Sequence, residues 1–282
     1  MQKGRITLHI CTKDRHSELA LLLQSLRTQS FQEFDILILD DASGTPVHMN
    51  NFLQSIMTRM KLEGHKFKML RNEQSFGCCA ARNKCIEEDD FDNEFTCRLD
   101  DDVILEPDYL ENLMGGIDRG YDMMTGVVPL MSTPEMIRET KYIGEIMNEK
   151  VFDKEGNIVK YGDECGFCYD GGIIVQTDEF RTNCIYRSEI NKSVRYPDGL
   201  SHVAFREEGH FSMRAIIEGY KIGVHTGAVC YHLQTPSGGN RCSDYAEKVQ
   251  IDEETFRKWM KQQFIKHGDF LKEYHKNGKY KK

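Results

Sequence analysis

Short apolar runs alternate with amphipathic stretches through the first half of the chain. Runs at residues 6–10, 34–39, 67–70 and 95–99 predict strands, and the second is nearly all apolar, as a parallel strand buried on both faces should be. The stretches between them carry apolar residues at helical spacing. In the first stretch leucines recur at 19, 22, 23 and 26, and Ser17 is the predicted N-cap. This alternation predicts an α/β fold with a doubly wound, mostly parallel sheet and right-handed crossovers.

The second half of the chain has shorter and less regular elements. Strands are predicted at 123–130, 173–175, 184–187 and 221–224, with a further segment at 229–233 and a hairpin at 151–159 that turns at 155–157. A helix is predicted at 206–219 and a flexible loop at 236–240. We therefore expect a smaller, mixed subregion beside the parallel sheet.

The C-terminal part predicts one amphipathic helix from residue 252 onward, followed by a lysine-rich end. Phe256, Trp259, Met260 and Phe264 recur at helical spacing. We expect this apolar side to pack onto the domain. Contact with an anionic membrane surface is the alternative.

Charge and composition narrow the classes of function. The 282 residues carry a net charge of -8 and have a pI near 5.7, which argues against a general nucleic-acid binder. No apolar run approaches the roughly 18–20 residues of a membrane span. The apolar run at 6–11 is too short for a signal-peptide core. We expect a cytoplasmic protein, with peripheral membrane attachment through the C-terminal tail left open.

The ten cysteines are scattered along the chain. Cys165 and Cys168 have the spacing of a metal or redox pair, but a zinc site needs a second close pair, which the sequence lacks. We therefore expect reduced structural thiols.

Three consecutive carboxylates end the predicted strand at 95–99. Alternate strand residues share a face, so Asp100 and Asp102 can point the same way while Asp101 points elsewhere. Two hard oxygen ligands facing a cleft suit Mg²⁺ or Mn²⁺. A solvated acidic turn that caps a helix at Asp108 is the alternative, and this run alone does not decide between them.

Polar residues also follow two other predicted strands, at 12–15 and 40–41. The carboxyl ends of parallel strands meet at one edge of a sheet, where such folds bind ligands. The three polar clusters are therefore predicted to converge. Structural alternatives stay open for several of the candidate residues. Asp40 and Asp41 could cap a turn, Glu207 and Glu208 could stabilise a helix dipole, and His232 and Arg82 could be a structural histidine and a surface arginine.

An ordered set of motifs resembles the family 2 glycosyltransferases of the GT-A fold. The set covers most of residues 5–235 in the family's order, and the order is far more specific than any one motif. Its segments are residues 10–15 and 39–43, residues 77–83, residues 99–102 with 105–110, the pair Glu207-Glu208 with 212–215 and 219–222, and Tyr231-His232.

The resemblance implies a donor site for a nucleotide-diphosphate sugar, with a UDP-sugar favoured. Asp41 would accept a hydrogen bond from the base, Arg82 would lie near the base, and Asp100 would lie near the ribose. Further binding residues are expected among the polar clusters. The implied binding residues are Thr12, Arg15, Asp41, Arg82, Asp100 and Asp101.

The resemblance also implies a metal site and a catalytic base. Asp102 would hold Mn²⁺ or Mg²⁺ at the two phosphates, and His232 matches a further metal ligand of some members. Glu208 falls where the family has its base, but Glu207 directly precedes it, and the choice between them stays open. A metal-held diphosphate leaving group and one carboxylate base suit single displacement with inversion.

The implied activity is sugar transfer to a hydroxyl of a glycan, glycolipid or glycoprotein. The alternative is a catalytically inactive GT-A-like domain that binds a sugar or a protein partner. The implied division has a nucleotide-sugar-binding half at 1–125, an acceptor-binding and catalytic half of the same domain at 126–245, and a basic helical tail at 246–282.

Overall fold

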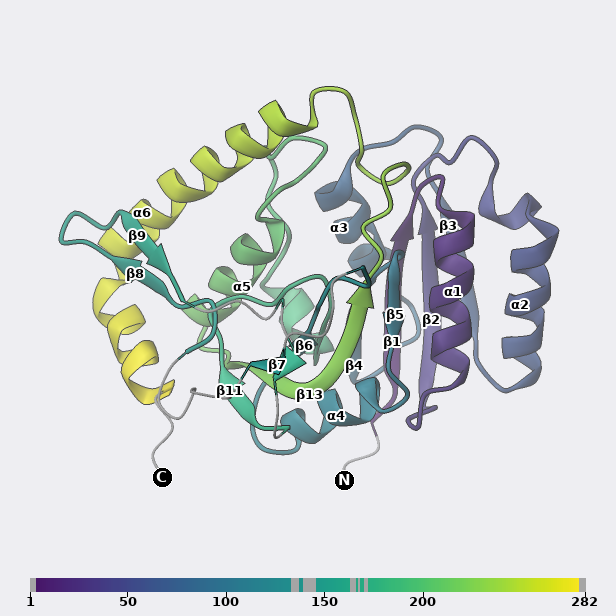
Figure 1. The fold of residues 1–282 in the computed structure, drawn as a ribbon, viewed down its shortest axis with the longest axis horizontal. Helices are drawn as coiled ribbons and strands as arrows, with labels where there is room; N and C mark the ends of the chain where they lie inside the picture. The colour runs from purple at the N-terminus through teal and green to yellow at the C-terminus, as the bar shows by residue number, and fades with distance from the viewer. Residues whose placement is uncertain are drawn as a thin grey trace.

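A single sheet runs through the protein (Figure 1). The computed structural model describes residues 4–132, 137–138, 146–162, 166, 168–169 and 172–278. Among these, nine strands form the sheet, in the order β11-β13-β6-β12-β4-β1-β2-β3, with β5 paired to β13. The strands are β1 (Ile6–Thr12), β2 (Phe34–Asp40), β3 (Phe67–Arg71), β4 (Phe95–Asp100), β5 (Val103–Leu105), β6 (Met123–Val127), β11 (Ile174–Gln176), β12 (Cys184–Arg187) and β13 (Ile222–His232).

Most of these strands run in one direction, as predicted. β3, β2, β1 and β4 are parallel neighbours, and β6 and β13 are parallel to each other. β12 lies antiparallel between β4 and β6, which gives those two strands the same direction, while β11 and β5 run against β13. The expected α/β fold with a mostly parallel sheet is confirmed.

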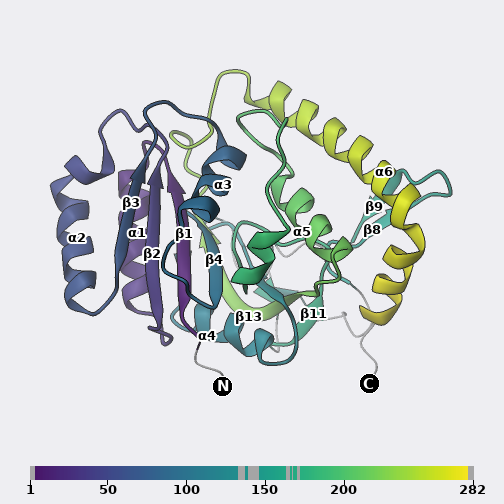
Figure 2. The ribbon, with the colours of Figure 1, turned by 180° about the vertical axis from the view of Figure 1, so that it is seen from behind.

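Helices cover both faces of the sheet. α1 (His16–Arg27) and α4 (Tyr109–Ile117) lie on one face, and α2 (Asn51–Leu62) packs against α1 (Figure 1). α3 (Cys78–Glu88) and α5 (Glu207–Ile217) lie on the other face, which Figure 2 shows from behind. The alternation of side chains along β2 fits this arrangement, because Ile36 and Ile38 join the core under α1 while Leu37 and Leu39 join the core under α3.

The smaller elements lie in the second half of the chain. β8 (Lys150–Phe152) and β9 (Ile158–Tyr161) form the predicted hairpin, and Gly156 in its turn has the positive φ of 81° that favours glycine. β7 (Ile137–Arg138) pairs with β10 (Cys168–Tyr169). Two 3₁₀ turns lie at η1 (Val47–Met49) and η2 (Ser188–Lys192). Cys165 and the side chain of Cys168 lie outside the described residues.

The predicted boundaries differ from the structure at three places. α1 begins at His16, so Ser17 lies in its first turn, and Arg15 occupies the N-cap position without a side-chain capping bond. The segments predicted at 221–224 and 229–233 are parts of one strand, β13, whose register along β6 shifts between Val224 and Val229. That irregularity, which a polar stretch occupies, is why the sequence pattern appeared broken.

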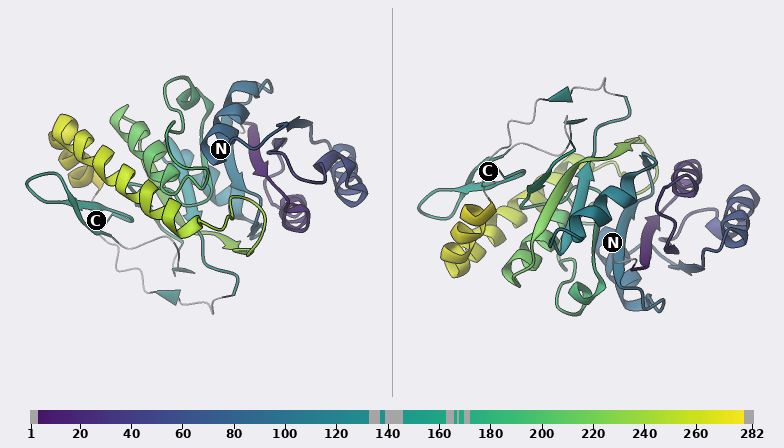
Figure 3. Two further views of the ribbon diagram at one scale, coloured as in Figure 1. Left: turned by 90° about the horizontal axis from the view of Figure 1, so that it is seen from above. Right: turned by 90° about the horizontal axis from the view of Figure 1, so that it is seen from below.

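The third difference concerns the C-terminal helix. α6 (Tyr245–Gly278) begins seven residues earlier than the predicted start at 252 and has a non-helical residue at His267. Its apolar side packs onto the domain, with Phe256, Met260 and Leu271 buried in the core that α5 shares. Figure 3 shows α6 alongside α5. Of the helices that the structure describes, none combines the length and apolar character needed to span a bilayer. Membrane contact through this helix stays a prediction.

His210 lies at the interface between α5 and α6. Its ring is 3% exposed and lies 4.4 Å from the ring of Trp259 and 5.1 Å from that of Phe256, measured between centroids. Neither ring nitrogen has a hydrogen-bond partner among the described residues. Burial, together with the charge of Arg214, lowers the pKa of His210 to about 4.

Because burial lowers its pKa, His210 should make the free energy of unfolding decrease as the pH falls. The unfolded chain binds a proton at His210 near pH 6.5 and the folded chain only near pH 4, so the contribution of His210 to stability is present above pH 6.5 and is lost as the pH falls to 4. His210→Phe should remove about 3 kcal/mol of the decrease in unfolding free energy across that window. Urea unfolding of both proteins between pH 4 and pH 7 measures the difference. Parallel pH curves for the two proteins would contradict the assignment.

Candidate active site

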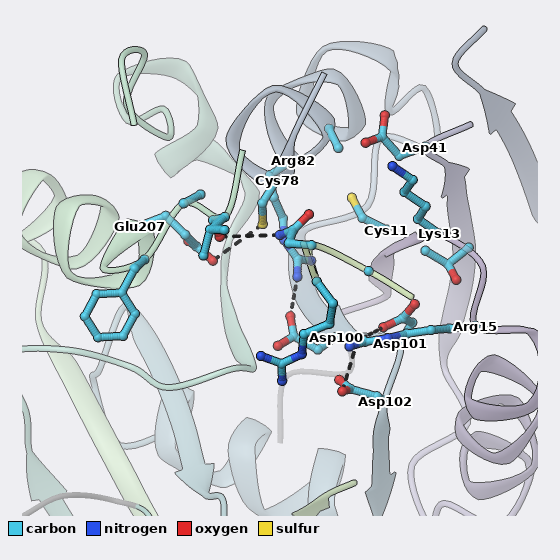
Figure 4. Close-up of a pocket in the computed structure, with 18 of the residues that line it drawn as sticks. Cys11, Lys13, Arg15, Asp41, Cys78, Arg82, Asp100, Asp101, Asp102 and Glu207 are labelled. Atoms are coloured by element: carbon cyan, nitrogen blue, oxygen red, sulfur yellow. Dashed lines mark hydrogen bonds and ion pairs between the residues drawn. The ribbon is translucent and has the colours of Figure 1, made fainter. Parts of the chain in front are cut away.

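One pocket lies beyond the carboxyl ends of the parallel strands, and Figure 4 shows many of the side chains that line it. Every residue for which the sequence predicted a site role lines this pocket. Those residues are Thr12, Arg15, Asp41, Arg82, Asp100, Asp101, Asp102, Glu207, Glu208 and His232. They come from the first, second and fourth strands of the chain, from α3 and α5, and from the end of β13. The structure thus brings the predicted residues together, and their chemical roles stay predictions.

Asp100, Asp102 and His232 form a cluster that can hold a cation. Asp100 ends β4, Asp102 follows in the turn, and pairing of β13 with β5 places His232 opposite Val103. One ligand atom from each of the three side chains lies within 4.8 Å of the others, and His232 Nε2 lies 3.2 Å from Asp102 Oδ1. Two carboxylates and an imidazole form a donor set that fits Mn²⁺ or Mg²⁺.

The acidic turn is not solvated. Asp101 and Asp102 are 4% and 2% exposed. Asp108, at the N-cap of α4, makes no side-chain capping bond. The alternative of a solvated turn that caps the helix therefore does not describe Asp101 and Asp102.

Arg15 neutralises part of the acidic turn and contacts the loop that follows β13. Its Nη1 lies 3.0 Å from Asp101 Oδ1 and 3.0 Å from Asp102 Oδ2. Burial raises the pKa of Asp101 to about 7, although the charge of Arg15 acts in the opposite direction. Arg15 Nε donates to the carbonyl oxygen of Ser237 at 3.2 Å, and a Cβ added to Gly238 would lie 2.7 Å from Arg15 Cγ. The loop predicted at 236–240 thus rests on the end of β1.

Arg98 lines the pocket and was not among the residues predicted from the sequence. Its guanidinium contacts both carboxylate oxygens of Glu207, at 2.6 and 2.7 Å, and lies 3.2 Å from Asp100 and 3.3 Å from Glu208. The side chain is 2% exposed. The central guanidinium carbon of Arg98, Cζ, also lies 5.2 Å from the ring centroid of Phe180. A signal was present, because an arginine two positions before Asp100 on a buried strand must share its face.

Glu207 and Glu208 begin α5 but face different surroundings. Glu207 is 2% exposed, and burial raises its pKa to about 8 while its ion pair with Arg98 acts the other way. The side chain of Glu208 is 25% exposed and makes one long contact with Arg98. Of the pair, Glu208 is the carboxylate that solvent and ligands can reach.

Asp41 and Arg82 also line the pocket, and neighbouring polar groups hold each of them. Asp41 accepts hydrogen bonds from Asn72 Nδ2 at 2.7 Å and from Ser75 Oγ at 2.6 Å. Arg82 is 5% exposed, pairs with Asp100, and donates to the carbonyl oxygen of Leu99 at 3.1 Å. A surface role for Arg82 is therefore wrong.

Solved structures of glycosyltransferases resemble this chain in fold. S. aureus TarS matches with a TM-score of 0.55 and 18% identity over 88% of this chain and 39% of TarS. GalNAc-T7, in a structure with UDP, GalNAc and Mn²⁺, matches with a TM-score of 0.66 and 13% identity over 98% of this chain and 55% of that chain. The mannosyltransferase PcManGT from Pyrobaculum calidifontis, in complex with GDP-Man and Mn²⁺, matches with a TM-score of 0.54 and 13% identity over 82% of this chain and 57% of that chain.

The chain thus spans well under two thirds of TarS and of GalNAc-T7. No curated protein matches it in sequence. The model of the family described as "Glycosyl transferase family 2" matches residues 7–178, which is more than half of the chain. The parallel sheet, the pocket beyond its carboxyl ends and this match together show that the protein belongs to glycosyl transferase family 2.

Proposed function

We propose that this protein transfers a sugar from a nucleotide-diphosphate sugar to an acceptor hydroxyl, with divalent-metal assistance and inversion at the anomeric carbon. The observation that carries the proposal is the shared pocket of Asp100, Asp102, His232 and Glu208. It combines a cation site suited to a diphosphate with a separate reachable carboxylate. An arrangement of this kind serves single displacement without an enzyme nucleophile.

Asp102, His232 and Asp100 are the residues that would hold the metal. A bound Mn²⁺ or Mg²⁺ would supply Lewis-acid neutralisation of the negative charge that develops on the departing diphosphate. Two similar structures, GalNAc-T7 and PcManGT, contain Mn²⁺ with UDP or GDP-Man, and TarS binds UDP-GlcNAc. These likenesses support a divalent ion and a nucleotide sugar as the ligands here, with a UDP-sugar favoured.

Asp41 is the proposed acceptor of a hydrogen bond from the nucleotide base. Asn72 and the backbone N–H of Phe76 donate to its Oδ1, and Ser75 donates to its Oδ2, which keeps a further lone pair for a ligand. Arg82, which pairs with Asp100, would lie near the base, and Asp100 would lie near the ribose. Thr12 and Arg15 line the same pocket. The donor would thus bind across the ends of β1, β2 and β4.

Glu208 is the proposed catalytic base. It must accept a proton from the attacking hydroxyl, so it needs a lone pair that a ligand can reach. Glu207 lacks this, because Arg98 engages both of its oxygens in a buried ion pair. Glu207 would instead orient Arg98, which lies between Glu208 and Asp100.

An inactive domain that only binds a sugar or a partner is the second candidate. The intact cation cluster and the reachable Glu208 favour the enzyme, because a binding domain needs no base opposite a diphosphate site. Acceptor identity would follow from the half of the pocket near Val203, Phe205 and Tyr245, which carries no predicted site residue.

Asp102→Ala should abolish the metal dependence of nucleotide binding. Asp102 is the carboxylate that contacts His232 in the cation cluster, and without it two ligands remain. Titration calorimetry with UDP, in the presence and absence of Mn²⁺, measures the effect. Asp108→Ala is the matched control, because this exposed aspartate lies in the same segment outside the pocket. Mn²⁺-dependent binding that persists in Asp102→Ala would contradict the proposed metal site.

Glu208→Gln should leave nucleotide binding intact and reduce turnover by about 10²–10⁴-fold, since the amide cannot accept the proton. Release of UDP from UDP-sugars in the presence of Mn²⁺ gives the rate. Glu207→Gln is the companion variant, expected to lower the melting temperature while it keeps Glu208 as base. If Glu208→Gln stays active and Glu207→Gln loses turnover at unchanged fold, the base is Glu207.

A further inference from the structure

The segment that leads into Glu207 and Glu208 has a strained backbone. Ala204 and Arg206 adopt positive φ angles of 55° and 69°. Residues other than glycine rarely adopt this left-handed conformation, and it persists only where the surroundings impose it. Arg206 is also the N-cap residue of α5, whose first residues are Glu207 and Glu208. Whatever holds this segment therefore sets where the two glutamates enter the pocket.

Asp252 of α6 holds the segment through three hydrogen bonds. Its Oδ1 accepts from the backbone N–H of Ser201 at 2.7 Å, and its Oδ2 accepts from Ser201 Oγ at 2.7 Å and from the backbone N–H of Phe205 at 2.9 Å. The Asp252 side chain is 1% exposed. Hydrogen bonds to a buried carboxylate are about twice as strong as neutral ones.

The next residue on α6 holds the other end of the segment. Glu253 Oε2 accepts from Arg206 Nε at 2.6 Å, and Arg206 also lies 3.6 Å from Glu179. Adjacent residues of one helix thus contact both strained positions or their neighbours. The side chains or backbone of Val203, Ala204 and Phe205 line the pocket itself, so the segment is part of the site that α6 braces.

We propose that Asp252 is a positioning residue for the catalytic base, acting through the segment 201–206. The inference rests on the proposed function and extends it to a helix that lies beyond the family match at 7–178. In this proposal α6 both covers the core and, through Asp252, positions the segment that leads into Glu208.

The donor side of the pocket has separate supports. Asp41 is held by Asn72 and Ser75, and Asp100 is held by Arg82, and none of these residues belongs to α6. Loss of the Asp252 contacts should therefore displace Glu208 and leave nucleotide binding unchanged. If Asp252 had only a structural role, its loss would instead weaken turnover and nucleotide binding together, in proportion to the fraction of protein that is unfolded.

Asp252→Asn is the sharpest variant. The asparagine side chain has the shape and size of aspartate, but an NH₂ group replaces one of the two carboxylate oxygens. That donor would face the backbone N–H of Phe205 or of Ser201, which needs an acceptor. We expect kcat for release of UDP from the UDP-sugar that the wild-type protein uses to fall roughly 10- to 100-fold, as for a misplaced catalytic group. The Kd for UDP with Mn²⁺ should stay within about twofold, since the donor contacts are separate.

His275→Asn is the matched control for attachment of α6. His275 anchors the far end of the same helix through Asp178, with 2.8 Å between Nε2 and Oδ2, and lies outside the segment 201–206 and the active-site pocket. We expect it to lower the melting temperature without changing kcat at a temperature where both proteins are folded. Equal losses of kcat in Asp252→Asn and His275→Asn would overturn the proposal.

Hydrogen exchange tests the contact without any assay of activity. The backbone amides of Ser201 and Phe205 donate to Asp252, so peptides covering 200–206 should exchange roughly tenfold faster in Asp252→Asn. Faster exchange with unchanged kcat would overturn the positioning role while leaving the proposed function intact. If the wild-type protein turns over no nucleotide sugar, the proposed function fails, and exchange still reports whether Asp252 holds the segment. Unchanged exchange would overturn the proposal outright.

Discussion

The buried guanidinium of Arg98 is the interaction on which the two sides of the site depend. A cation at 2% exposure is costly unless carboxylates surround it, and breaking such a pair typically costs about 3–5 kcal/mol. Here the carboxylates come from Asp100 on the same strand and from Glu207 and Glu208 on α5, more than a hundred residues later in the chain. The start of α5 must therefore lie at the end of β4. The same ion pairs fix the distance between the proposed metal site and the proposed base.

The sheet supplies the rest of the cation site. β13 runs parallel to β6 and then, past its irregularity, pairs with β5, the strand that directly follows the acidic turn. This pairing brings His232 to Asp102, and the backbone N–H of Leu233 donates to the Asp102 carbonyl at 2.9 Å. The cluster thus depends on backbone pairing between distant segments, which leaves the three ligands prearranged and limits the reorganisation that metal binding would require.

The sequence could predict what periodicity and strand order control. The sequence predicted the strands of the first half, the convergence of their carboxyl ends and ten of the residues that line the pocket. Arg98 was missed because its spacing from Asp100 shows only that the two side chains share a face, whereas its partners Glu207 and Glu208 lie more than a hundred residues later in the chain. The continuity of β13 was missed because a register shift interrupts the pattern, and the start of α6 because its first turns are polar. The role of Asp252 could not be predicted, since two of its three hydrogen bonds at 201–206 come from backbone N–H groups, which every residue except proline possesses.

The two halves of the site therefore differ in what maintains them. The proposed donor half is made by strand ends, with carboxylates held by side chains such as Asn72 and Arg82 at the sheet edge. The half with the proposed base follows a segment with left-handed residues that Asp252 and Glu253 of α6 contact. Strain of this kind is sustained by contacts outside the segment. A change in the packing of α6 would consequently act on the proposed base before it acts on the proposed donor site, because α6 contacts the segment that leads into Glu208 whereas Asp41 and Asp100 have supports outside that helix.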